Sequence, residues 1–131
     1  MNPRWSFGEA TVLRATGFIH LAIMAMGLIA PASLLGAWNL PFGEPATFTR
    51  AFLLAYGALG LALVRAARVP REQGALLVET IALVKLAFFA VIVADIMARK
   101  LPNRAAIAVI LDVIFGIALY RAGRRASPQT P

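Results

Sequence analysis

Apolar residues in this chain gather into four long blocks, separated by short polar segments that contain proline. The blocks cover residues 11–35, 49–64, 74–98 and 104–120. A helix of about 20 apolar residues crosses a bilayer core of about 30 Å, so each block has roughly the length of a membrane span. The second and fourth blocks are short, and we expect them to stand nearly upright or to use flanking residues. The segments between the blocks, "GAWNLPFGEPATF", "RAARVPREQG" and "RKLPN", are typical helix breakers.

The pattern of blocks predicts an all-α fold: a four-transmembrane-helix bundle with up-down topology. One membrane domain would cover residues 1–123, and a short polar tail residues 124–131. The composition agrees, because only 15% of the residues are charged, whereas soluble domains carry about 25%. The formal charge of +7 does not indicate a nucleic-acid partner, since the basic residues lie at the block ends without interleaved aromatic residues. We therefore expect the lipid bilayer, and no nucleic acid, as a partner.

Basic residues predict the orientation of the spans. One side would carry Arg4, Arg14, Arg65, Arg68, Arg71, Arg121, Arg124 and Arg125, and the other only Arg50, Arg99, Lys100 and Arg104. Positive charge is retained in the cytoplasm, so both termini of this multi-pass membrane protein should be cytoplasmic. The loop at residues 36–48 would then be extracytoplasmic, with Trp38 and Phe42 at the interface. A signal peptide ending in Ala-Pro-Ala at residues 30–32 is the rival interpretation of the first block, although that block is long for one.

Ionisable residues inside the blocks are the strongest functional signal. At about 1.5 Å of rise per residue, Lys85 lies roughly 16 Å from the cytoplasmic side, and Asp112 roughly 12 Å from the opposite side. The two charges therefore fall at nearly the same depth in a core of about 30 Å. His20 and Tyr56 fall at a similar level in the first and second blocks. A charge at the bilayer centre costs on the order of 3 kcal/mol, so we expect Lys85 and Asp112 to pair inside the bundle.

The pair has two interpretations that the sequence leaves open. It can fix which helix packs on which, or it can belong to a ligand or proton site, as ionisable groups in membrane spans commonly do. Candidate ligand-binding residues are His20, Tyr56, Lys85, Asp112 and Glu79; candidate catalytic residues are Lys85, Asp112 and His20. A metal site is not expected, because the chain has one histidine and no cysteine. Nucleotide-binding and hydrolase motifs are missing from the sequence, and we expect no cofactor.

Three further side-chain relations are predicted near the block ends and on the second block. Glu79, about one turn inside the cytoplasmic boundary, is expected to pair with an interfacial arginine. Asp95 and Arg99 stand four residues apart and would pair along one helical face. Gly57 and Gly60 give the second block a small-residue surface that allows close helix contact.

Several of these features together resemble the DoxX-like group of small bacterial four-helix membrane proteins. They are Pro31 closing the first block, Arg50 opening the second, "AYGALGLAL" at residues 55–63 and "LDVIFG" at residues 111–116. The resemblance covers roughly residues 10–123. It implies a compact four-helix bundle in a bacterial inner membrane, and an accessory role near quinones, since some relatives are linked to quinone-dependent oxidoreductase complexes.

Three functions from different classes are compatible with these residues. The first is a binding protein or accessory subunit of a membrane complex, which holds a quinone, isoprenoid or lipid with its polar head at His20, Tyr56 and Lys85. The second is a small membrane enzyme, in which Lys85 or His20 acts as a base oriented by Asp112. The third is proton-coupled transport by a homo-oligomer, with Glu79 or Asp112 as the coupled site. Whether the protein is an enzyme stays open at this point.

Overall fold

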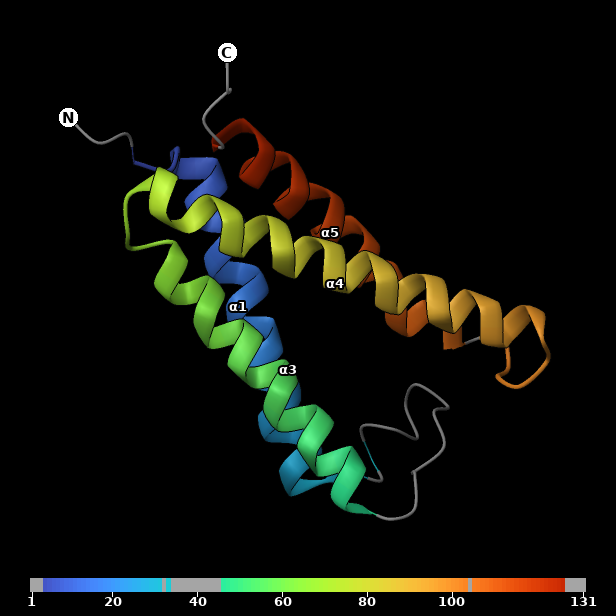
Figure 1. The fold of residues 1–131 in the computed structure, drawn as a ribbon. Helices are drawn as coiled ribbons and strands as arrows, with labels where there is room; N and C mark the ends of the chain where they lie inside the picture. The colour runs from blue at the N-terminus through green and yellow to red at the C-terminus, as the bar shows by residue number, and fades with distance from the viewer. Residues whose placement is uncertain (1–3, 32, 34–45, 104, 127–131) are drawn as a thin grey trace.

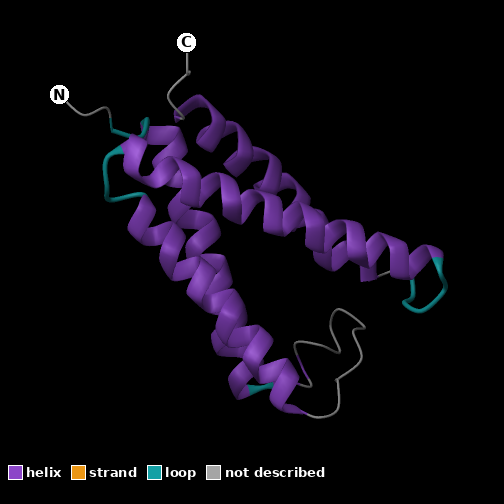
Figure 2. Cartoon of the chain, in the orientation of Figure 1, coloured by secondary structure: helices purple, strands orange, loops and turns teal. Residues whose placement is uncertain are grey.

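The computed structural model describes residues 4–31, 33, 46–103 and 105–126. Within these ranges the chain is helical and has no strand, as Figure 2 shows. The four helices are α1 (Phe7–Ile29), α3 (Ala46–Ala66), α4 (Arg71–Met97) and α5 (Ala105–Ala126) (Figure 1). The all-α expectation is therefore confirmed.

The helices form two hairpins. α1 lies along α3, and α4 lies along α5 (Figure 1). The first hairpin has its backbones in close contact at two glycines: a Cβ on Gly60 would lie 2.6 Å from the Gly17 carbonyl oxygen, and a Cβ on Gly17 would lie 2.6 Å from that of Gly60. Gly60 belongs to the small-residue surface predicted on the second block, and that surface does contact a neighbouring helix.

The two hairpins meet at one end and diverge toward the other. The start of α1 and the end of α5 lie at the end where the hairpins meet (Figure 1). The shared hydrophobic core consists of Trp5, Leu13, Leu63, Ala66, Ala67, Ala75, Val78, Ile81, Ala82, Leu119 and Ala122. Toward the diverging end, large apolar side chains such as Met26, Phe52 and Val91 are exposed. The arrangement is thus more open than the compact bundle that the family resemblance implies.

Polar contacts near the N-terminus hold the two hairpins together where they meet. Ser6 caps α1 in a capping box with Glu9, and the Arg71 guanidinium of α4 pairs with the Glu9 carboxylate at 2.9 Å. The Trp5 indole N–H donates to the Ala66 carbonyl at the end of α3, at 2.8 Å. Arg71 also lies over the Trp5 ring, 5.9 Å from its centroid. These contacts tie the start of the chain to the α3–α4 turn.

The predicted pairing of Asp95 with Arg99, at the turn between α4 and α5, is wrong. Asp95 pairs with Lys100 at 3.4 Å and not with Arg99. The reason is that α4 ends at Met97, and Arg99 takes a left-handed conformation with φ 57°. The Arg99 N–H donates to the Ile96 carbonyl and the Lys100 N–H to the Asp95 carbonyl, both at 2.9 Å, which is the hydrogen-bond pattern of a Schellman cap. The four-residue spacing therefore no longer places Arg99 on the helical face of Asp95.

Three of the described helical segments are long and apolar enough to cross a membrane: Phe7–Ile29, Thr49–Ala66 and Arg71–Met97. The helices also extend past several predicted span boundaries, for example from Phe7 in α1 and to Ala126 in α5. Helix α5 thereby takes in residues 124–126 of the expected tail. Most of the expected outer loop, including Trp38 and Phe42, lies outside the described residues, as do residues 127–131.

Candidate functional site

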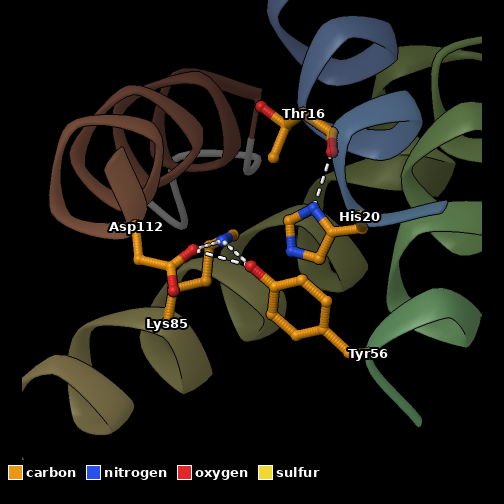
Figure 3. A network of polar contacts seen from close by, with 5 residues as sticks. All are labelled: Thr16, His20, Tyr56, Lys85 and Asp112. Carbon is orange, nitrogen blue, oxygen red and sulfur yellow. Dashed lines mark hydrogen bonds and ion pairs between the residues drawn. The ribbon is translucent and has the colours of Figure 1, made fainter. Parts of the chain in front are cut away.

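A polar cluster lies inside the molecule and takes one side chain from each helix: His20 of α1, Tyr56 of α3, Lys85 of α4 and Asp112 of α5 (Figure 3). Lys85 is 3% exposed and Asp112 is 8% exposed. The Lys85 ammonium and the Asp112 carboxylate form a direct ion pair. The predicted pairing of Lys85 with Asp112 is therefore confirmed, and His20 and Tyr56 lie beside the pair.

The Tyr56 hydroxyl completes a triangle with the ion pair. It donates to Asp112 Oδ1 at 3.0 Å and accepts from Lys85 Nζ at 3.5 Å. Lys85 Nζ also lies 5.4 Å from the centroid of the Tyr56 ring. All of the hydrogen bonds that described residues make to the Asp112 carboxylate fall on Oδ1. No described residue donates a hydrogen bond to its second oxygen, Oδ2.

His20 packs directly behind this triangle. Its ring stacks on the Tyr56 ring with centroids 4.1 Å apart and an interplanar angle of 23°. The Nδ1 atom lies 2.6 Å from the Thr16 carbonyl oxygen, and because that oxygen can only accept, Nδ1 must carry the proton. The other ring nitrogen, Nε2, is buried without a hydrogen-bond partner among the described residues, as is the Thr16 hydroxyl. In Figure 3, Nε2 faces the side on which the Tyr56 hydroxyl and Lys85 lie.

Glu79 is not part of the cluster. It is half-buried where α4 meets α5, and a Cβ on Gly123 would lie 3.0 Å from the Glu79 Cβ. The expected pairing of Glu79 with an interfacial arginine is not seen among the ion pairs of the described residues. The backbone and Cβ of Glu79 lie in the close α4–α5 contact.

A pocket opens beside the cluster, with a cavity volume of about 240 Å³. It is lined by Phe52, Ala55, Tyr56 and Leu59 of α3, Val84, Lys85 and Phe88 of α4, and Asp112 of α5. Two aromatic stacks form one wall: Phe52 lies 5.8 Å from Tyr56 and 5.7 Å from Phe88, measured between ring centroids. The pocket thus has apolar walls and a polar end made by Tyr56, Lys85 and Asp112. The described residues contain no group of three or more side chains suited to hold a metal ion.

The sequence argument missed six residues of the site, namely Thr16, Phe52, Ala55, Leu59, Val84 and Phe88. Thr16 precedes His20 by one helical turn, and Phe52 precedes Tyr56 by the same spacing, so each pair had to share a helical face. That spacing was a usable signal for both residues. Phe88 follows Lys85 by three residues and so shares its helical face as well, but its contact with Phe52 depends on how α4 packs against α3.

Comparisons with known proteins assign neither a family nor a function to this chain. No protein-family model, curated protein or solved structure matches the chain. The resemblance to the DoxX-like group therefore stays a proposal. Function has to be inferred from the pocket and the cluster.

Proposed function

We propose that this protein is an integral membrane four-helix bundle that binds an apolar small molecule in the pocket between its two hairpins. The polar head of the molecule would meet Tyr56, Lys85 and Asp112, and its apolar part would follow the aromatic wall. The observation that carries the proposal is the pocket itself, whose apolar walls end on a buried ion pair. Ligand pockets commonly combine apolar walls with a few convergent polar groups in this way.

The membrane setting is supported by three apolar helical segments and by the distribution of positive charge. Four helices with up-down topology would place both termini and the α3–α4 turn in the cytoplasm of a bacterium. The exposed apolar side chains of the diverging hairpins would then face lipid and not water. This setting also supplies the ligand, because apolar molecules reach the pocket from the bilayer.

Pocket size indicates how such a molecule would bind. A volume of about 240 Å³ is below the roughly 300–1,000 Å³ of pockets that enclose a drug-sized ligand. The pocket therefore suits a head group and the first part of a chain, while the rest of the molecule remains in lipid. Quinones, isoprenoids and other lipids have this shape. An accessory role in a quinone-dependent complex, suggested by the DoxX-like resemblance, is compatible with it.

Co-purification tests the proposal directly. The protein, extracted in a mild detergent, is examined by native mass spectrometry, and the bound molecule is then identified after solvent extraction. Ala55→Leu fills the pocket, and we expect it to lower the retained amount about tenfold or more. Ala58→Leu makes the same change on the same helix at an exposed residue that does not line the pocket, and it should retain the wild-type amount. Equal retention by both variants would contradict the assignment of the pocket.

A small membrane enzyme is the second candidate, and one observation favours it. His20 Nε2 lies beside the ion pair with no hydrogen-bond partner in the described part of the chain, and positioned bases of this kind serve in proton transfer. Incubating the purified protein with the extracted molecule separates the two functions. A binding protein returns that molecule unchanged, whereas an enzyme converts it, and His20→Phe should then abolish the conversion.

A further inference from the structure

At the polar end of the pocket, most hydrogen-bond donors have partners among the described residues, whereas some acceptors have none. The Tyr56 hydroxyl donates its only hydrogen to Asp112 Oδ1. Lys85 directs two of its three N–H groups at Asp112 Oδ1 and at the Tyr56 oxygen, which leaves one donor. Asp112 Oδ2 accepts no hydrogen bond from the described residues, although Asp112 lines the pocket.

His20 adds a second unused acceptor behind the first. Its proton is held on Nδ1 by the Thr16 carbonyl, so in the neutral ring Nε2 carries a lone pair and no hydrogen. A doubly protonated ring would place another positive charge in the apolar interior beside Lys85, which is costly. His20 is 1% exposed, and none of the residues that the structure describes makes a hydrogen bond to Nε2. The cluster therefore offers more free acceptors than free donors.

We infer that the ligand of this pocket carries a hydroxyl head, as an apolar alcohol or a hydroquinone does, and not a carbonyl or ether head. This inference rests on the proposed function and narrows it to one head-group chemistry. The hydroxyl oxygen accepts the remaining N–H of Lys85, and the hydroxyl hydrogen is donated to Asp112 Oδ2. His20 Nε2 lies behind as the second acceptor.

Other head groups leave these acceptors unpaired. A quinone carbonyl or an ether oxygen can accept from Lys85, but it has no hydrogen for Asp112. A bound ligand also excludes water from the pocket, so Oδ2 would be desolvated without compensation. Sites built to hydrogen-bond a hydroxyl discriminate strongly against analogues that lack it.

Matched ligand pairs test the inference on the intact wild-type protein. Purified protein in lipid nanodiscs is dialysed against dodecanol or its methyl ether, and against a decyl hydroquinone, kept reduced, or the corresponding decyl benzoquinone. Empty nanodiscs correct for partition into lipid. We expect the hydroxyl member of at least one pair to bind about tenfold or more tightly than its partner. The pair that shows the preference identifies the source as an aliphatic alcohol or a hydroquinone.

A single substitution should reverse the preference. Asp112→Asn keeps an oxygen for Lys85 and Tyr56 but places an amide N–H₂ where Oδ2 stood, so the pocket gains donors and loses its free acceptor. The ether or quinone should then bind more tightly than its hydroxyl partner. Glu79→Gln makes the same carboxylate-to-amide change outside the pocket and should keep the wild-type preference.

The outcomes separate the two proposals. Where Asp112→Asn does not fold, the wild-type ligand pairs decide alone. Equal or tighter binding of the ether and the quinone by the wild-type protein overturns the hydroxyl inference and leaves the binding function standing. Failure of all four molecules to bind, with no co-purified molecule in native mass spectrometry, overturns the proposed function itself.

Discussion

Removing one member of the buried ion pair should destabilise the protein strongly. Among the described residues, Lys85→Met leaves the Asp112 carboxylate with the Tyr56 hydroxyl as its one partner, and Asp112→Leu leaves the Lys85 ammonium with the same hydroxyl. Both groups are buried, at 3% and 8% exposure. Each single change should therefore lower the free energy of unfolding by about 3–5 kcal/mol, the range found when a buried pair loses one partner.

Removing both charges should restore most of this loss. The double variant Lys85→Met with Asp112→Leu buries no charge, but it leaves the Tyr56 hydroxyl without a partner, which costs about 1–3 kcal/mol. Adding Tyr56→Phe removes that hydroxyl as well. The triple variant should come within about 1.5 kcal/mol of the wild type, as volume-conserving apolar replacements do.

Reversible unfolding in detergent micelles, followed by far-ultraviolet circular dichroism, measures these differences. Lys100→Met is the matched control, because the Lys100–Asp95 pair is exposed and such pairs contribute about 0–1 kcal/mol. A loss of under about 1 kcal/mol for Lys85→Met would refute the reasoning, since the ammonium would then be hydrated and not buried. Equal destabilisation by the double and single variants would equally refute direct pairing.

The remaining predictions concern packing, the α4–α5 turn and topology. Gly60→Ala should lower the free energy of unfolding by about 1–3 kcal/mol, because the added Cβ would lie 2.6 Å from a backbone oxygen of α1. Gly8→Ala is the control: its added Cβ meets nothing within 4 Å, so the same unfolding assay should show no loss of stability or a small gain. Arg99→Gly should stabilise by about 1 kcal/mol, since glycine adopts the left-handed conformation at φ 57° without steric cost. In intact cells, a cysteine replacing Arg68 should react only with membrane-permeant maleimides and one replacing Asn103 also with impermeant ones, and the opposite pattern would overturn the proposed orientation.

The main features of the fold and of the polar cluster could be predicted because they depend on local quantities. The length of an apolar block predicts a helix, and the rise per residue places Lys85 and Asp112 at one depth. The high cost of an isolated charge in an apolar interior then makes their pairing the expected outcome. Such arguments need only the sequence and the thickness of a bilayer.

Contacts that depend on helix rotation or on a helix end were not predicted from the sequence. Asp95 pairs with Lys100 and not with the predicted Arg99, because α4 ends at Met97 and Arg99 no longer continues the helix. The Glu9–Arg71 pair required the start of α1 to lie against the start of α4, which spacing along the chain does not reveal.

The sequence by itself determined that the chain forms four helices, and it predicted that one ionisable or polar residue from each would meet at a similar level. Only the tertiary structure decided that the helices pair as two diverging hairpins, and that a pocket with an aromatic wall opens beside the cluster. It also decided which acceptors the described residues leave unused: their hydrogen bonds to Asp112 fall on one carboxylate oxygen, and the Thr16 carbonyl fixes the proton of His20. The physical reason is that depth follows from the rise along a single helix, whereas a pocket and its free hydrogen-bonding groups follow from the rotation of each helix against its neighbours.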